Sequence, residues 1–319
     1  MKKALMILLA TAIVGAGATP AKAGVSEKKK SVAANKKAPR VAVQFKPGNK
    51  VARAKSSQRL ASLDDARHLA LQSSAVMVQD QATGAVLYEK NPTAVLPIAS
   101  ITKLMTAMVV LDASPDLHES LAIGEDDVDI LKGTRSRLKV GTHLEREEML
   151  RLALMSSENR AASALSRHYP GGREAFVAAM NQKAHALGLT DTRFHDATGL
   201  TAANVSSPRD LAKMVNAAHQ YPLIREFSTT SEGEFSIAGR PQQFRNTNTL
   251  VKSPAWEIGL SKTGYINEAG KCLVMQAWLN NKPIIIVLLD SWGRMTRIGD
   301  ANRIKRWVES ASLARPAAG

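Results

Sequence analysis

The sequence predicts an α+β fold, because strand-like segments gather at the two ends of the folded region and helix-like segments occupy its middle. Apolar residues with short turns beside them predict strands over residues 74–80 and 84–89 near one end. Two further apolar segments, 271–279 and 283–290, flank Asn280-Asn281-Lys282 and predict a second hairpin near the other end. Segregated blocks of this kind favour α+β over alternating α/β architecture. We expect these strands to form one antiparallel sheet.

The helices between and beyond these strands are predicted from apolar residues at helical spacing. Three of them occupy residues 100–111, 144–167 and 173–187. A further helix is expected near residues 63–71, where the folded region begins. The last helix is expected at about residues 299–312, on a face of the sheet.

Most of the basic charge lies outside this folded region. The chain has 319 residues and a formal net charge of +15. Residues 24–60 carry eleven lysines and arginines and a single acid, Glu27, whereas residues 61–319 carry only +2. We therefore expect a basic disordered linker over residues 24–62. A nucleic-acid partner is not expected, because DNA-binding domains carry their positive charge on the folded surface. Two interpretations of the linker stay open: contact with an anionic wall or membrane surface, or a solvated spacer.

The first 23 residues have the pattern of a secretory signal peptide. Met1-Lys2-Lys3 precedes an apolar run from Ala4 to Ala18, and Ala21-Lys22-Ala23 supplies a small-x-small cleavage site. The apolar run is shorter than the roughly 20 residues that a membrane span needs. We expect cleavage after Ala23 and export to the periplasm, with an uncleaved membrane anchor as the alternative.

Three short motifs carry the candidate chemistry. In chain order they are Ser100-Ile101-Thr102-Lys103, Ser157-Glu158-Asn159 and Lys262-Thr263-Gly264. Ser100 opens a predicted helix, so Lys103, three residues later, lies on the same helix face. A serine hydroxyl needs a base to become a nucleophile, and a lysine serves as one only if burial or nearby cations lower its pKa. Lys262 would supply such a cation. Alone, each motif also fits a helix cap, a polar loop or a turn.

The three motifs in this order resemble those of the low-molecular-weight penicillin-binding proteins, which are serine D,D-peptidases. Three longer segments strengthen the resemblance, and it extends over residues ~70 to ~312. They are Ser156-Ser157-Glu158-Asn159-Arg160-Ala161-Ala162, His195-Asp196-Ala197-Thr198-Gly199-Leu200 and Gly259-Leu260-Ser261-Lys262-Thr263-Gly264-Tyr265. The resemblance implies a β-lactamase/transpeptidase-like fold, in which flanking helices and a mostly helical subdomain accompany the antiparallel sheet. It places the peptidase domain at residues 63–315.

The resemblance also implies catalytic roles for three side chains. Ser100 would be the nucleophile that forms an acyl-enzyme, and Lys103 would be its general base. Ser157 would pass a proton to the leaving amine.

Substrate binding would involve six further residues. Asn159 would bind a peptide carbonyl, while Lys262 and Thr263 would hold the substrate carboxylate. Gly264 would let another backbone approach closely, and the backbone N–H of Tyr265 would join that of Ser100 in the oxyanion hole. Arg297 would be either a carboxylate-binding arginine or part of a surface ion pair.

The resemblance leaves several activities to compare. A class A β-lactamase needs a glutamate for deacylation, but residues 190–205 offer only the acids Asp191 and Asp196, so we expect stable acylation by β-lactams as covalent inhibitors. The chain ends 57 residues after Lys262, without the extra β-rich domain of the membrane-attached carboxypeptidases. We therefore expect an endopeptidase that cleaves D-alanyl-diaminopimelate cross-links in peptidoglycan, with a carboxypeptidase or an inactive wall-binding homologue as alternatives.

No cofactor or metal is expected. Cys272 is the single cysteine, and the seven histidines lack paired ligand spacing. Cys272 is expected to be a small buried apolar residue.

Overall fold

The computed structural model describes residues 69–293 and 295–313, all within one unit of the chain, residues 50–319. The predicted signal peptide and basic linker lie outside the described residues. The helix expected near residues 63–71 overlaps them only at residues 69–71, which have irregular backbone.

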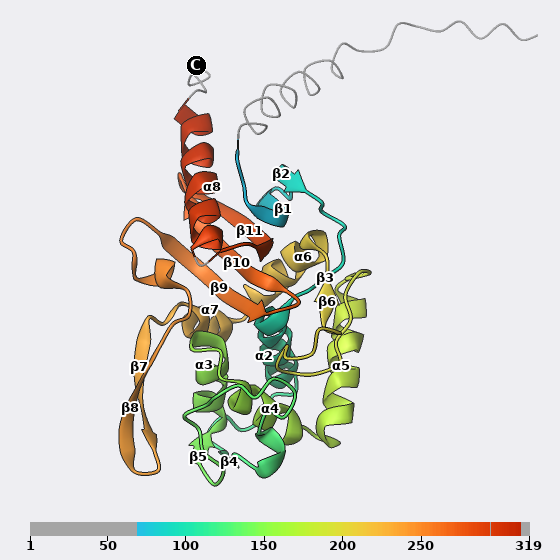
Figure 1. Ribbon diagram of the computed structural model, residues 1–319, viewed down its shortest axis with the longest axis vertical. Coiled ribbons are helices and arrows are strands. Elements are labelled where there is room, and N and C mark those ends of the chain that lie inside the picture. Colours follow the sequence, from blue (N-terminus) through green and yellow to red (C-terminus); the bar gives the residue numbers. More distant parts are fainter. Residues whose placement is uncertain (1–68, 294, 314–319) are drawn as a thin grey trace, which may run out of the picture. The chain divides into compact units, whose positions relative to one another are not determined.

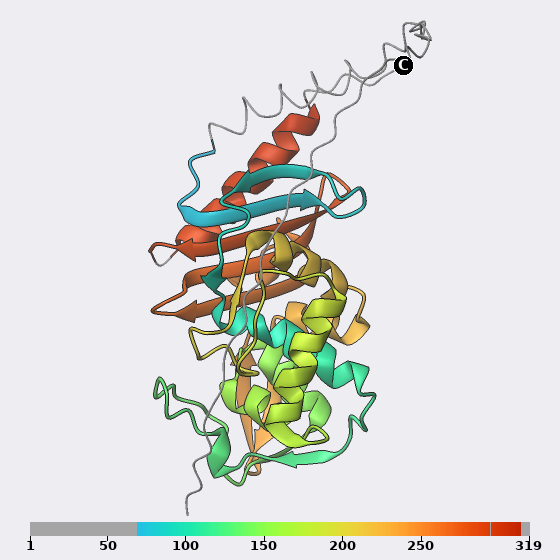
Figure 2. The same ribbon diagram turned by 90° about the vertical axis from the view of Figure 1, so that its right-hand side faces the viewer.

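A five-stranded antiparallel sheet joins the two ends of the folded region, as predicted. Its strand order is β2-β1-β11-β10-β9. The strands are β1 (Ser73–Asp80), β2 (Val86–Lys90), β9 (Glu257–Ile266), β10 (Gly270–Leu279) and β11 (Lys282–Ser291). Figure 2 shows β1 and β2 beside the C-terminal strands. The fold thereby brings β1, from the start of the domain, against β11, near its end.

Alternate residues of the central strands face two different hydrophobic clusters, as the two-residue period of a strand requires. In β11, Ile285, Val287 and Leu289 belong to the cluster that the sheet shares with the helical part. Ile284 and Ile286 face the opposite cluster, which includes Ala301 and Ile304 of α8 (Thr296–Leu313). The final helix therefore packs on one face of the sheet, as predicted, and Figure 1 shows it there.

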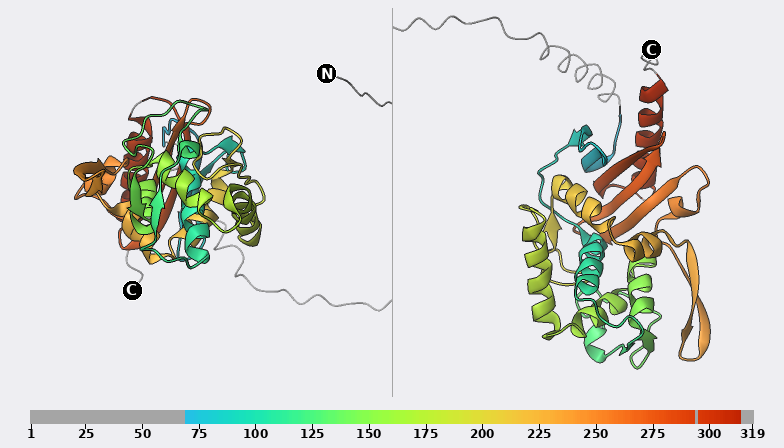
Figure 3. Two further views of the ribbon diagram at one scale, coloured as in Figure 1. Left: turned by 90° about the horizontal axis from the view of Figure 1, so that it is seen from below. Right: turned by 180° about the vertical axis from the view of Figure 1, so that it is seen from behind.

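The other face of the sheet packs on helices. The remaining helices are α2 (Thr102–Asp112), α3 (Arg146–Met155), α4 (Asn159–Arg167), α5 (Gly172–Ala186), α6 (Pro208–Ala218) and α7 (Pro222–Thr229). Of these, α6 contacts β1, β10 and β11. Seen from behind in Figure 3, α2 lies among the other helices. This arrangement is the helical subdomain that the family resemblance implies.

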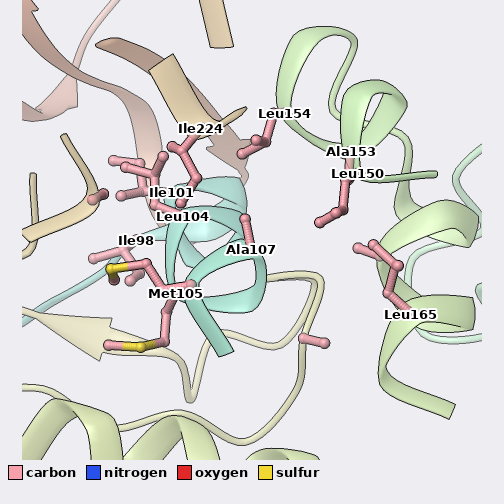
Figure 4. Packing of buried hydrophobic residues seen from close by; sticks show 14 of the residues in the cluster. Ile98, Ile101, Leu104, Met105, Ala107, Leu150, Ala153, Leu154, Leu165 and Ile224 are labelled. Carbon is pink, nitrogen blue, oxygen red and sulfur yellow. The ribbon is translucent and has the colours of Figure 1, made fainter. Parts of the chain in front are cut away.

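Helix α2 is the centre of the helical part. Every residue from Thr102 to Val110 is buried, and a helix that is apolar on most sides is suited to such a place. In Figure 4, Leu104 and Met105 of α2 lie among side chains from the neighbouring helices. The helix that begins just after Ser100 is thus held on all sides.

Short elements complete the described part of the chain. They are β3 (Leu96–Pro97), β4 (Ser120–Ala122), β5 (His143–Glu145), β6 (Val205–Ser206), the hairpin strands β7 (Glu232–Ile237) and β8 (Arg240–Arg245), and the 3-10 helices η1 (Ala99–Ile101), η2 (Glu125–Asp127) and η3 (Thr249–Lys252).

The single helix predicted over residues 144–167 is wrong, because the chain breaks it into α3 and α4. Ser157 lies in the break with φ of +63°, a left-handed conformation that no continuous helix contains. The polar S-E-N sequence there turns the chain between two buried helices.

Candidate active site

Side-chain hydrogen bonds join the three motifs in one place. Lys103 lies in the first turn of α2, and its Nζ lies 2.9 Å from Ser100 Oγ and 2.8 Å from Asn159 Oδ1. On strand β9, Lys262 Nζ lies 2.9 Å from Ser157 Oγ. The predicted nucleophile and its predicted base are therefore in direct contact, and both lysines bond to the S-E-N turn.

Lys103 is completely buried, and burial lowers its pKa to about 7, although Asp196 and Glu158 act in the opposite direction. Its third partner is the carbonyl oxygen of Thr198, 2.7 Å away. A neutral lysine amine has two protons and one lone pair. Asn159 Oδ1 and Thr198 O can only accept hydrogen bonds. If the amine donates its two protons to hydrogen bonds with them, its lone pair remains to accept a hydrogen bond from the Ser100 hydroxyl.

Lys262 is also buried, and its pKa lies well below the usual value, first because of burial and then because of Lys103 and Arg297. Besides Ser157, it donates to the carbonyl of Thr263 at 3.1 Å. The sequence suggested Lys262 as the cation that lowers the pKa of Lys103. That prediction is wrong, because burial and not the charge of Lys262 lowers the pKa of Lys103, whereas the charge of Lys103 contributes to the low pKa of Lys262.

The backbone near Ser100 is held in unusual conformations. Ala99, just before it, has φ of +48°, and Gly199 has φ of +83°. A Cβ atom added to Gly199 would lie 1.9 Å from the carbonyl oxygen of Ala99, so no larger residue fits without displacing the backbone before Ser100. Positive φ outside glycine is uncommon and typical of functional sites.

Gly264 allows strand β9 to approach the nucleophile. A Cβ atom there would lie 2.7 Å from the carbonyl oxygen of Ile98 and 3.3 Å from the amide nitrogen of Ser100. The close backbone approach expected from the K-T-G glycine is therefore present. It brings the backbone of β9 next to that of η1, where an oxyanion hole between Ser100 and Tyr265 was expected.

A loop that follows α5 supplies a partner that motif analysis missed. The carboxylate of Asp196 accepts hydrogen bonds from the backbone N–H groups of Thr198, Gly199 and Thr201 at 2.6–3.1 Å. This places the Thr198 carbonyl against Lys103. The sequence showed residues 195–200 as part of the family resemblance, but a backbone carbonyl gives no signal in residue type.

The remaining predicted residues lie along or behind strand β9. Thr263 Oγ1 lies 2.6 Å from Thr247 Oγ1. Tyr265 is 55% exposed, and the Lys271 ammonium lies 4.2 Å from the centroid of its ring. Arg297, in the first turn of α8, donates to the carbonyls of Gly264 and Cys272 at 3.0 and 3.1 Å. The guanidinium thus contacts the backbone of two strands.

The comparison with protein families decides the affiliation of the chain. The peptidase family described as D-alanyl-D-alanine carboxypeptidase matches residues 62–293. The chain belongs to this family. Its predicted membership among the serine D-alanyl-D-alanine peptidases is confirmed.

The names of curated relatives agree with this family assignment. The D-alanyl-D-alanine endopeptidase of Pseudomonas aeruginosa is 51% identical over 78% of this chain and 81% of its own. The Escherichia coli protein of the same name is 49% identical over 76% and 78%. The D-alanyl-D-alanine carboxypeptidase DacF of Bacillus subtilis is 33% identical over 69% of this chain and 58% of its own.

Solved structures confirm the predicted fold. The DD-transpeptidase from Streptomyces has 28% identity and a TM-score of 0.69, covering 74% of this chain and 97% of its own. A D-alanyl-D-alanine carboxypeptidase from Mycobacterium tuberculosis has 25% identity and a TM-score of 0.68, covering 77% and 93%. The α+β fold is thus the β-lactamase/transpeptidase-like one.

Over residues 69–293 and 295–313, no helix is long and apolar enough to cross a membrane. In the same part of the chain, no three or more histidine, cysteine, aspartate and glutamate side chains group as metal ligands.

Proposed function

We propose that this chain is an exported serine D,D-endopeptidase that cleaves D-alanyl-diaminopimelate cross-links in peptidoglycan. The observation that carries the proposal is the contact of buried Lys103 with Ser100, Asn159 and Thr198. The endopeptidase names of relatives that are 49–51% identical favour cross-link cleavage over removal of a terminal D-alanine.

Acylation begins at Ser100. Neutral Lys103 takes the hydroxyl proton, and Ser100 Oγ attacks the carbonyl carbon of the D-alanine that donates the cross-link. The developing oxyanion is held by the backbone N–H groups of Ser100 and Tyr265, and each such donor is worth roughly 10²–10³ in rate. The peptide C–N bond then breaks, leaving an ester on Ser100.

The leaving diaminopimelate amine must gain a proton. Ser157 is suited to deliver it, because its hydroxyl lies 2.9 Å from Lys262 and can be reprotonated from that side. Lys262 and Thr263 bind the carboxylate next to the scissile amide, with Arg297 adding positive charge behind them. Asn159 binds a substrate carbonyl, and Gly264 keeps β9 close enough for Tyr265 to act. Lys103 then passes the proton that it took from Ser100 on to the Ser157–Lys262 pair and, neutral again, activates the water that hydrolyses the ester; the proton taken from water returns to Ser100.

β-Lactams acylate the same serine in this scheme and hydrolyse slowly, because no glutamate in the family pattern activates a deacylating water. Export depends on residues 1–23, and the basic segment 24–62 contributes attraction to an anionic wall or membrane surface. No nucleic acid, cofactor or metal takes part.

The decisive experiment incubates the purified chain with a cross-linked muropeptide dimer and follows the products by chromatography and mass spectrometry. Conversion of dimer to monomers is expected, and Ser100→Ala is the matched inactive control. If only terminal D-alanine is removed from pentapeptides, the activity is that of a carboxypeptidase. Absence of any product, together with absence of labelling by a fluorescent penicillin, would support an inactive wall-binding homologue instead.

A further inference from the structure

One segment outside the three motifs, residues 129–138, lies alongside the S-E-N turn. Thr134 Oγ1 lies 3.1 Å from Asn159 Nδ2, and Ser136 Oγ lies 2.7 Å from Glu158 Oε2. The segment is therefore bonded through side chains to the turn that contacts both active-site lysines.

Asp129 organises this segment from its beginning. Its carboxylate accepts hydrogen bonds at 2.9 Å from the backbone N–H groups of Leu131, Lys132 and Thr134. It also accepts a hydrogen bond from the Thr134 hydroxyl, whose oxygen lies 2.6 Å from Asp129 Oδ2. Partial burial acts to raise the pKa of Asp129, but these hydrogen bonds hold it below its usual value. The group is thus an ionised acceptor at neutral pH.

The direction of these bonds determines which way the Asn159 amide faces. The Thr134 hydroxyl has one proton, and an ionised carboxylate can only accept it. Thr134 Oγ1 can then only accept from its other neighbour, so the NH₂ group of Asn159 must face Thr134. The amide oxygen is left for Lys103 Nζ at 2.8 Å.

A reversed amide would disturb the base. It would turn the NH₂ group of Asn159 toward Lys103 and remove an acceptor for one amine proton. The NH₂ group would then compete with the Ser100 hydroxyl for the lone pair of neutral Lys103.

We propose that Thr134 is a positioning residue, which holds the Asn159 amide so that the lone pair of Lys103 stays directed at Ser100. Asp129 acts behind it by accepting the hydrogen bond that the Thr134 hydroxyl donates. The inference rests on the proposed function, since it assigns Lys103 as the base for Ser100.

The test measures acylation by a fluorescent penicillin at increasing concentrations, which separates the acylation rate constant from the binding constant. The full chain is compared with Thr134→Val and Thr134→Ala, which lack the hydroxyl, and with Thr134→Ser, which keeps it. We expect the acylation rate constant to fall about tenfold in the first two variants, as expected when one neutral hydrogen bond is lost. Binding should change less than about twofold, and Thr134→Ser should restore the rate.

The pH profile supplies a readout that a merely structural role would not move. A reversed Asn159 amide donates to neutral Lys103 and stabilises that form, which lowers the pKa of Lys103. In Thr134→Val, the acidic limb of the acylation rate against pH should therefore move to lower pH, and the plateau rate at high pH should fall. Thr83→Val is the control, because Thr83 is an exposed turn threonine whose Oγ1 accepts only from Ala85 N among the bonds described for it. Its rate and profile should match those of the unaltered chain.

Three outcomes are distinguishable. Rates within twofold of the unaltered chain in both Thr134→Val and Thr134→Ala would overturn the inference, and so would a loss that Thr134→Ser fails to restore. Absence of labelling at Ser100 in the unaltered chain would instead contradict the proposed function.

Discussion

The candidate active site has two halves that hold their lysines by different means. The sheet half is strand β9 with Lys262, and the helical half is the start of α2 with Lys103 and the segments that contact it. Lys262 lies within a regular ladder, where it pairs with Val274 and its neighbours pair in register. Lys103 lies at the start of a buried helix, in the part of the site where Ala99 has a positive φ and Gly199 lies against the backbone of Ala99. The S-E-N turn that supplies Asn159 to Lys103 also contains a left-handed residue, Ser157. The sheet half thus depends on repetitive hydrogen bonding, whereas the helical half depends on a few unusual conformations. Single changes in the helical half should therefore have the larger effects.

The largest effect is expected from replacing Lys103. Lys103→Met removes the amine while keeping an apolar chain of similar length, and it should lower the acylation rate constant about 10²–10⁴-fold, as expected for loss of a general base. Lys262→Met should act more on the binding constant, because Lys262 is proposed to hold the carboxylate. Saturation kinetics with a fluorescent penicillin separate the two. If Lys103→Met and Lys262→Met lowered the acylation rate constant by the same factor and neither changed the binding constant, the division between the two halves would be contradicted.

The pH dependence of the unaltered chain tests the same lysine. Because burial lowers the pKa of Lys103 to about 7, the neutral base predominates above pH 7 and the protonated form below it. The second-order acylation rate should therefore rise with pH, with a midpoint near 7. A midpoint near the ordinary lysine value would contradict the lowered pKa of Lys103.

Gly199→Ala should have the next largest effect. The added methyl group would lie 1.9 Å from the Ala99 carbonyl oxygen at φ of +83°, so the backbone before Ser100 must move. A displacement of this kind costs about 100-fold in rate. The matched control is Gly239→Ala in the β7–β8 turn, where φ is +72° but an added Cβ atom would have no atom within 4 Å beyond the adjacent residues.

The two variants, Gly199→Ala and Gly239→Ala, also separate the energetic cost of backbone strain from that of steric overlap. Gly239→Ala should lower the free energy of unfolding by about 1 kcal/mol through strain alone. Gly199→Ala should lower it by roughly 1–3 kcal/mol more through overpacking. Urea unfolding measures both, and equal losses would mean that the contact with Ala99 is unimportant.

The sequence predicted the parts of the molecule that local pattern controls. Apolar segments located β1, β2, β10 and β11. Helices α6 and α7 were not predicted, although each begins with a proline and Ser207 caps α6, which are available start signals. The hairpin β7–β8 was missed because charged and polar residues dominate its sequence, and only Phe235, Ile237 and Phe244 are buried.

The candidate site was predictable where it depends on side chains within motifs. Ser100 and Lys103 are three residues apart, so helix geometry alone brings them together. The contact of Lys103 with Thr198 spans 95 residues and uses a backbone carbonyl, which leaves no pattern in the sequence. The left-handed Ser157 was also unpredictable, because serine has no preference for that conformation.

Ser157 allows strain and chemistry to be separated within one position. Ser157→Ala and Ser157→Gly both remove the hydroxyl that contacts Lys262, so both should lose the proposed proton transfer. Glycine accepts φ of +63° without strain, so Ser157→Gly should be about 1 kcal/mol more stable than Ser157→Ala. Thermal unfolding of the two variants gives the difference. Equal stability would mean that the turn relaxes when its hydroxyl is removed.

The smallest effect is expected in the sheet half, at Cys272. Burial raises the pKa of its thiol to about 11, and Sγ lies 3.3 Å from the carbonyl oxygen of Ala269. The folded chain should therefore resist a thiol reagent at pH 8, whereas the unfolded chain should react, because only the thiolate is nucleophilic. Cys272→Ser keeps a donor for Ala269 and should change the free energy of unfolding by less than about 1.5 kcal/mol, the range for a single hydrogen bond.

Since Cys272 pairs with Gly264 in the ladder, acylation in Cys272→Ser also tests whether the sheet holds β9 independently of one side chain. A large loss of acylation there would mean that β9 is as sensitive as the strained half of the site, and the contrast between the halves would fail.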